Sequence, residues 1–205
     1  MKKSGFTLSE LIVSLGVIAV ISAFVIPAIM NVMPDKNKIR VLNYHTSIAT
    51  TTETLLANKG LYAPKMIYKA ETGRYEQDCI GLACTQACVD VDNAYSGDSK
   101  YGNLLFKALD FDGSTHPDGS VWTVKFTKSD GNHLISIDAD SKNSKNCYYK
   151  KNSCESPDIF RFKVNPLGKV EANDALTYAY LLNPENMNNR KEDLRVAKAN
   201  AGKFK

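Results

Sequence analysis

An α+β fold is predicted for the 205-residue chain, with a long N-terminal helix whose outer half packs on an antiparallel sheet of three to four strands. Apolar side chains recur at helical spacing in the first 60 residues. Beyond residue 120 their spacing changes to two, which is typical of strands with one buried face. Because the two patterns come from separate segments, the helix and the sheet are independent parts of the prediction.

The N-terminal segment is apolar and long enough to cross a bilayer. No charged residue occurs from Leu11 to Met33. As a helix, the part from Leu11 to Met30 would span about 30 Å, which is the hydrocarbon thickness of a bilayer. Lys2 and Lys3 precede it, so the positive-inside rule places the N-terminus in the cytoplasm. We therefore expect a single-pass membrane protein with an extracytoplasmic C-terminal domain.

The residues at the start of this segment occur in a specific order. KKSG is followed by FTLSELIVSLGVIAV, so a basic leader, a glycine, an aromatic residue, a glutamate and an apolar run have fixed spacing. This arrangement resembles the class III leader of type IV pilins and of type II secretion pseudopilins. A cleaved secretory signal peptide fits less well, because its apolar region has about 7–15 residues and no acidic residue at its head.

The resemblance implies roles for individual residues. A prepilin peptidase would cut after Gly5 and methylate the new N-terminal residue, Phe6. Glu10 would then meet the Phe6 amine of a neighbouring subunit during assembly. This pairing would offset much of the cost of a charge in the membrane, which is about 2.5–3.5 kcal/mol on insertion scales. Pro27 lacks an amide proton and suits a helical region that unwinds when subunits enter a filament.

The patterns and the resemblance together divide the chain into segments. These are the leader (1–5), the transmembrane and assembly helix (6–33), the outer half of the helix (34–60), the extracytoplasmic α+β globular domain (61–172) and a polar C-terminal tail (173–205). In the outer half, one stripe at helical spacing is expected to face the sheet. It consists of Val41, Tyr44, Ile48, Leu55 and Leu56. The tail begins with NDALTYAYLL, for which we expect one or two helical turns, and its remainder, residues 183–205, lacks a core pattern, so we expect that part to be mobile.

Segments of period two predict the strands. Trp122, Val124 and Phe126 alternate with polar residues, and SDGN then forms a hairpin turn before HLISIDA. DIFRFKV follows with Phe160 and Phe162 on one face, and the turn NPLG leads to KVEA. The family has the same pilin-like order, a helical spine followed by an antiparallel sheet.

All five cysteines follow the apolar segment, on the extracytoplasmic side where disulfides form. Their spacings, C-x4-C-x3-C and C-x6-C, differ from the C-x2-C pairs of zinc sites, so we favour disulfides. Cys147 and Cys154 are the favoured pair, because they close a short polar loop. Of Cys79, Cys84 and Cys88, two could pair and one would be left over, and the sequence does not decide which.

One acidic run offers oxygen ligands. Asp138, Asp140 and Asn143 form the pattern D-x-D-x-x-N, and some secretion pseudopilins bind calcium in loops of this sheet. Lys142 takes a ligand position of an EF-hand, and no glycine or late glutamate follows, so we favour turn residues at a strand end over a calcium site. No serine elbow, paired-carboxylate pattern, HExxH motif or phosphate loop accompanies the three histidines. Neither an enzyme nor a cofactor is therefore expected.

Charge does not indicate a nucleic acid as the partner. The formal net charge is +4, and loss of Lys2 and Lys3 with the leader lowers the number of Lys and Arg from 26 to 24, against 22 Asp and Glu. Basic side chains are also scattered along the sequence, whereas nucleic-acid binding needs a concentrated basic surface.

The expected function is that of a structural subunit that polymerises through its apolar helix, in a type IV pilus-like or type II secretion pseudopilus filament at the surface or in the periplasm. Its expected partners are other pilin or pseudopilin subunits, the prepilin peptidase, the pilus or secretion assembly machinery and membrane lipid. FTLSE after the leader and the lack of a disulfide near the C-terminus favour a type II secretion pseudopilin. The alternative is a membrane-anchored extracytoplasmic ligand-binding or adhesive module, which would not need processing at Phe6.

Overall fold

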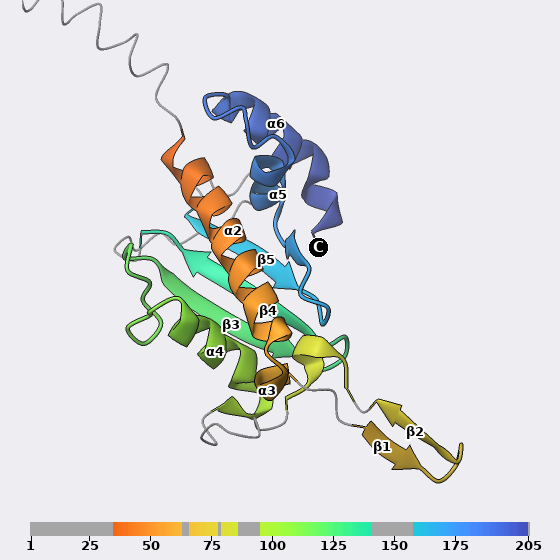
Figure 1. Cartoon of the computed structure of the whole chain (residues 1–205). Coiled ribbons are helices and arrows are strands. Elements are labelled where there is room, and N and C mark those ends of the chain that lie inside the picture. Colours follow the sequence, from red (N-terminus) through yellow and green to blue (C-terminus); the bar gives the residue numbers. More distant parts are fainter. Residues whose placement is uncertain (1–34, 63–65, 78, 86–94, 141–157, 205) are drawn as a thin grey trace, which may run out of the picture.

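The computed structural model describes residues 35–62, 66–77, 79–85, 95–140 and 158–204. A long helix, α2 (Lys36–Ala57), crosses one face of a four-stranded antiparallel sheet (Figure 1). This arrangement confirms the predicted α+β class and the packing of a helix on an antiparallel sheet. The expected membrane helix over residues 6–33 lies outside the described residues. Among the described helices, none has the length and apolar character needed to cross a membrane.

The buried face of α2 follows from its sequence. The predicted stripe is confirmed at Val41, Tyr44, Ile48 and Leu55, which are all buried, while Leu56 is partly buried. The helix ends at Ala57, and the short helix α3 (Lys59–Tyr62) follows. Asn58 separates the two because its backbone is extended and its side chain accepts a hydrogen bond from the amide of Gly60, at 3.0 Å.

The sheet consists of four strands in the order β3-β4-β5-β6, and each neighbouring pair is antiparallel. Their bounds are β3 (Val121–Thr127), β4 (Asn132–Asp138), β5 (Ile159–Val164) and β6 (Val170–Ala172). Trp122 lies opposite Ile137, which in turn lies opposite Phe160, and none of the three is exposed to solvent. The predicted alternation therefore produces one continuous apolar row beneath α2.

A second helix, α4 (Lys100–Ala108), packs on the same face of the sheet as α2. Tyr101 of α4 is fully buried, and its hydroxyl lies 2.7 Å from the Thr52 hydroxyl of α2. Its ring also contacts the ring of His133 in β4, with 4.5 Å between the ring centroids. One aromatic side chain thus joins both helices to the sheet.

A separate hairpin extends from the domain at the end opposite the start of α2 (Figure 1). It is formed by β1 (Met66–Lys69) and β2 (Arg74–Gln77), which the sequence patterns did not predict. Tyr68 and Tyr75 pair across it, with ring centroids 5.3 Å apart, and both remain exposed. Cross-strand aromatic contacts stabilise such a two-stranded unit in place of a core.

The C-terminal segment is folded. The helical turns predicted for NDALTYAYLL are present, whereas the prediction that residues 183–205 are mobile is wrong for the described part. This segment contains α5 (Ala175–Leu182), α6 (Arg190–Asn200) and the 3-10 helix η4 (Ala201–Lys203). Tyr180 of α5 is buried, and Asp193 and Ala197, one turn apart, form the buried face of α6. The prediction failed because a carboxylate occupies one of the two buried positions of α6, so no apolar periodicity marks this helix.

Candidate functional site

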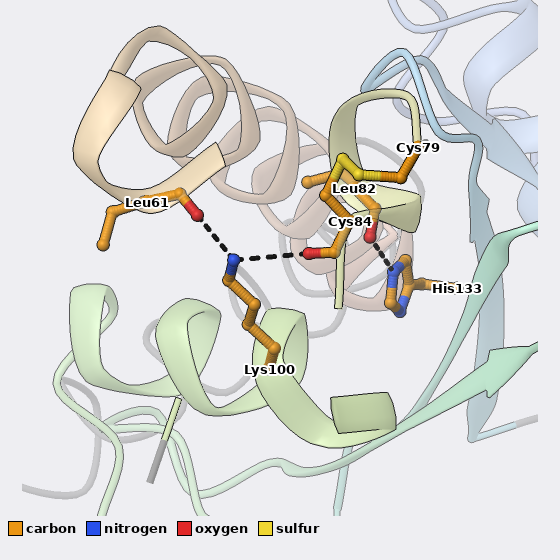
Figure 2. The surroundings of a disulfide bond; sticks show 6 residues. All are labelled: Leu61, Cys79, Leu82, Cys84, Lys100 and His133. Carbon is orange, nitrogen blue, oxygen red and sulfur yellow. Dashed lines mark hydrogen bonds between the residues drawn. A yellow bond between two sulfur atoms is a disulfide. The ribbon is translucent and has the colours of Figure 1, made fainter. Parts of the chain in front are cut away.

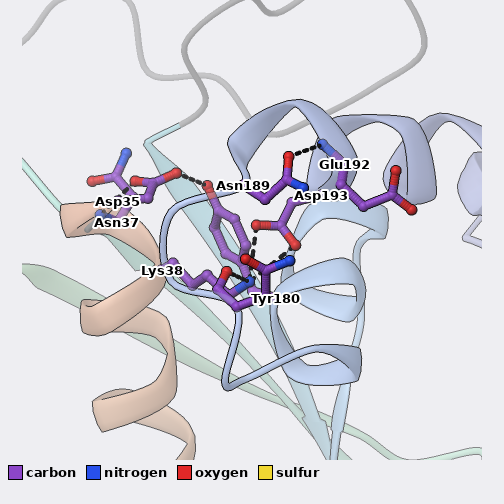
Figure 3. Close-up of polar contacts among 8 residues, drawn as sticks. Asp35, Asn37, Lys38, Tyr180, Asn189, Glu192 and Asp193 are labelled. Carbon is purple, nitrogen blue, oxygen red and sulfur yellow. Dashed lines mark hydrogen bonds and ion pairs between the residues drawn. The ribbon is translucent and has the colours of Figure 1, made fainter. Parts of the chain in front are cut away.

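The residues expected to direct processing and assembly lie outside the described part of the chain: Gly5, Phe6, Glu10 and Pro27. The structure does describe the point where that N-terminal segment enters the domain, at the start of α2. Side chains from the C-terminal helices contact this point, so distant parts of the sequence meet there (Figure 3). We call these residues the root of α2: Asp35, Lys38, Tyr180 and Asp193.

Asp35 joins the first turn of α2 to the C-terminal segment. Its Oδ1 accepts a hydrogen bond from the amide of Asn37, at 3.0 Å, and so caps the helix. Its Oδ2 accepts a hydrogen bond from the Tyr180 hydroxyl, at 2.9 Å, and its own amide donates to the Met187 carbonyl, at 3.0 Å. Burial, followed by the nearby Asp35 carboxylate, raises the pKa of Tyr180 above its ordinary value, so the phenol keeps the proton that it donates.

Lys38 is fully buried beside this contact. Its ammonium group donates to both carboxylate oxygens of Asp193, at 3.0 and 2.9 Å, and to the Asn186 carbonyl, at 2.8 Å. Three donors and three acceptors are thereby matched inside the protein. Burial raises the pKa of Asp193, and the charge of Lys38 opposes that rise. The pair fixes α6 against the start of α2.

A disulfide joins Cys79 to Cys84, which confirms that two of the three clustered cysteines pair (Figure 2). Cys88, Cys147 and Cys154 lie outside the described residues, and with them the favoured pair. The bridged segment contains the 3-10 helix η1 (Gly81–Ala83). Its Leu82 amide donates to the Pro166 carbonyl, at 2.8 Å, which attaches the segment to the turn between β5 and β6.

Two buried polar side chains, one from α4 and one from β4, contact backbone carbonyls of the bridged segment. Lys100 of α4 donates to the Cys84 carbonyl, at 3.3 Å, and to the Leu61 carbonyl of α3, at 2.5 Å. His133 of β4 contacts the Leu82 carbonyl through Nε2, at 3.3 Å. Burial lowers the pKa of His133, so the ring is neutral at pH 7 and Nε2 carries the donated proton. Figure 2 shows both side chains directed at carbonyls of the surrounding backbone.

The predicted acidic run is brought together only in part. Asp138 and Asp140 lie at the end of β4, and the Asp140 amide donates to Asp138 Oδ1, at 3.2 Å, as the predicted turn requires. Asn143 lies outside the described residues. Asp158 joins instead, and carboxylate oxygens of all three aspartates lie within 4.8 Å of one another. Sequence reasoning missed Asp158 because the chain returns to β4 only after residues 141–157.

A serine, a histidine and an aspartate meet beside α2, but their hydrogen bonds hold α2 on the sheet and do not form a catalytic triad. Asp118 accepts hydrogen bonds from the Ser120 hydroxyl, at 2.6 Å, and from the Tyr44 hydroxyl, at 2.8 Å. His116 Nδ1 lies 2.8 Å from the same carboxylate. The Ser120 oxygen also accepts the Trp122 indole proton, at 2.8 Å, and the serine is fully buried. An oxygen with those partners serves to attach α2 to β3 rather than to attack a substrate.

Comparison with known proteins agrees with the N-terminal motif. The family described as the prokaryotic N-terminal methylation motif matches residues 1–26. No curated protein and no solved structure matches the chain. The chain therefore carries, at residues 1–26, the class III prepilin leader that is typical of type IV pilins and pseudopilins, and this leader implies a membrane-anchored protein of the pilin type.

Proposed function

We propose that the protein is a structural subunit of a type IV pilus-like or type II secretion pseudopilus filament, without catalytic activity or a cofactor of its own. A prepilin peptidase processes it, and it assembles through its N-terminal helix. The observation that carries this proposal is the methylation motif at residues 1–26, which is followed after a few residues by a long helix packed on an antiparallel sheet. Leader and domain thus supply the two parts that a filament subunit needs.

The motif contains a device for joining subunits. Cleavage after Gly5 creates a cationic amine on Phe6, one helical turn from the Glu10 carboxylate. In a filament, Glu10 of one subunit neutralises the Phe6 amine of the next, and the low dielectric strengthens that attraction. An unpaired Glu10 is costly in the membrane, so the correct register of subunits is favoured over others.

The substitution Glu10→Val tests this device. We expect the variant to insert into the membrane as the wild type does, but to enter filaments at a level reduced by about tenfold or more, since one tenfold corresponds to about 1.4 kcal/mol of lost pairing. Glu53→Val is the matched control, because Glu53 is an exposed carboxylate on α2, beyond the apolar segment. The measurement is the fraction of the chain that chemical crosslinking in intact cells recovers in multimers, relative to the total in the membrane. Equal incorporation of Glu10→Val and wild type would overturn the proposal.

Within this class, we propose a type II secretion pseudopilus as the system. The FTLSE sequence after the leader and the lack of a cysteine beyond Cys154 support this choice. A strain that lacks the protein should lose secretion of folded extracytoplasmic proteins and keep its surface pili. Loss of motility or of surface pili with normal secretion would assign the protein to a type IV pilus instead.

A further inference from the structure

The domain carries basic side chains at the end that adjoins the membrane. The apolar run ends at Met33, and Lys36 follows three residues later. Three residues span at most about 11 Å, so Lys36 can reach the headgroup layer of a membrane that holds the chain. The turn before α6 lies at the same end, because the Asp35 amide donates to the Met187 carbonyl. Figure 1 shows α6 beside the start of α2 and far from the β1–β2 hairpin.

α6 directs a row of cations outward from this end. Lys191, Arg195 and Lys198 are separated by four and three residues, which places them on one face of the helix, and all three are exposed. Asp193 and Ala197 form the opposite, buried face. The Lys38–Asp193 pair therefore fixes which face of α6 points away from the core.

The acidic side chains of this region are mostly occupied. Asp35 and Asp193 are engaged within the root of α2. Glu192 pairs with Arg195, with 2.6 Å between carboxylate and guanidinium. Glu185, in the turn between α5 and α6, is an exposed acid next to these helices. Asp138, Asp140 and Asp158 also lie near the start of α2, because Arg40 donates to the Ala139 carbonyl, at 2.9 Å. Positive charge is therefore concentrated on α6 and at Lys36 rather than spread over the whole end.

Several exposed cations at this end form no salt bridge within the part of the chain that the structure describes. We call them the basic rim: Lys36, Arg190, Lys191 and Lys198. We propose that the basic rim binds the anionic phospholipid headgroups of the membrane in which the chain is anchored. This inference rests on the membrane anchoring that is part of the proposed function.

The position of the basic rim favours lipid over other anionic partners. While the chain is in the membrane, the N-terminal anchor keeps Lys36 and the adjoining turn next to lipid headgroups, and a soluble partner would have to displace those headgroups. Attraction to a charged surface acts within about 8–10 Å at physiological ionic strength. Because the Met187 carbonyl bonds the Asp35 amide and Lys191 follows four residues later, we place the first turn of α6 within this range. Lys59, at the other end of α2, is about 33 Å further along the helix and beyond that range. Binding would hold the C-terminal helices against the membrane until the subunit enters a filament.

Lysine reactivity in nanodiscs tests the inference on the full, unaltered chain. The discs hold single copies in phosphatidylcholine alone or in phosphatidylcholine mixed with phosphatidylglycerol, and mass spectrometry follows the acetylation rate of each lysine. A surface potential of about −30 mV should slow Lys36 and Lys191 by about threefold, because it keeps their amines protonated. Lys198, further along α6, should be slowed less, and Lys59 and Lys128 should not change. Salt at about 1 M should abolish the difference.

The possible failures are distinguishable. If Lys36 is slowed but Lys191 and Lys198 are not, the chain is anchored but α6 does not face the bilayer, and only the inference is overturned. If Lys36 is not slowed either, both the inference and the anchoring in the proposed function are contradicted. If Lys191 is protected only in discs that hold several copies, whatever the lipid charge, a second copy covers the basic rim and the lipid proposal is wrong.

Discussion

Lys38 is the residue on which the position of the C-terminal helices depends. A lysine without solvent exposure must be matched by acceptors, and Asp193 and the Asn186 carbonyl supply them. Removal of one member leaves an uncompensated charge inside the protein, whereas the intact pair contributes little net stability. The pair therefore acts mainly by fixing where α6 lies relative to α2.

We predict that Asp193→Ala lowers the free energy of unfolding by about 3–5 kcal/mol, because it leaves the buried Lys38 ammonium without its counter-ion. Glu192→Ala is the matched control, since Glu192 is the neighbouring acid and its ion pair within the described residues is with Arg195 on the surface. The measurement is denaturant unfolding of the detergent-solubilised chain. If both variants lost the same small amount of stability, the buried pair would not hold α6 as described.

The lowered pKa of Asp118 makes the free energy of unfolding depend on pH. Burial alone would raise the pKa of Asp118, but hydrogen bonds from Ser120, His116 and Tyr44 outweigh it and hold the pKa well below its ordinary value. The unfolded state therefore binds a proton first as the pH falls, so the stabilisation is complete above about pH 4 and is lost below it. Denaturant unfolding between about pH 5 and 2 should show a steeper loss for wild type than for Asp118→Asn. Parallel curves would contradict this assignment.

At the scale of elements, Gly81 determines whether the disulfide-bridged segment can dock. Its φ is 51°, and a Cβ at this position would lie 2.0 Å from the Pro166 carbonyl oxygen. That oxygen also accepts the Leu82 amide proton, so it cannot move without loss of a hydrogen bond. The segment can therefore reach the turn between β5 and β6 only with glycine here.

Gly81→Ala should be more destabilising than Gly73→Ala. Gly73 has a similar φ of 63° but nothing within 4 Å of the added Cβ, so its substitution measures the backbone strain alone, about 1–2 kcal/mol. The close contact at Gly81 should add about 1–3 kcal/mol. Unfolding free energies of the two variants provide the comparison, and equal losses would show that the segment does not dock on Pro166.

The elements that the sequence predicted are those with a buried apolar row. α2 and strands β3 to β5 each repeat an apolar residue on one face and contribute to the core, and Val170 of β6 packs against that core. α6 escaped prediction because its partner is the charge of Lys38, 155 residues away in sequence, rather than an apolar surface. Lys100 was missed for a related reason, since its acceptors are backbone carbonyls, which leave no trace in the residue types around them.

At the scale of the molecule, the chain enters the domain at one end and exposes its most separate element, the β1–β2 hairpin, at the other (Figure 1). Both chain segments that meet at the entry point, α2 and the C-terminal helices, are fixed there by the root of α2. The leader could be identified from sequence because it requires residue types at fixed spacing. The root could not, because its members come together only through the fold.

The mature N-terminus tests the central claim most directly, because every later step depends on it. Mass spectrometry of the protein purified from its own membrane should find a chain that begins at Phe6 and carries one methyl group on its amine, with Met1 to Gly5 absent. The Gly5→Leu variant, purified in the same way, should keep the leader. A wild-type chain that retains Met1, or that begins within the apolar run beyond Ala23, would contradict the account of this protein as a processed filament subunit.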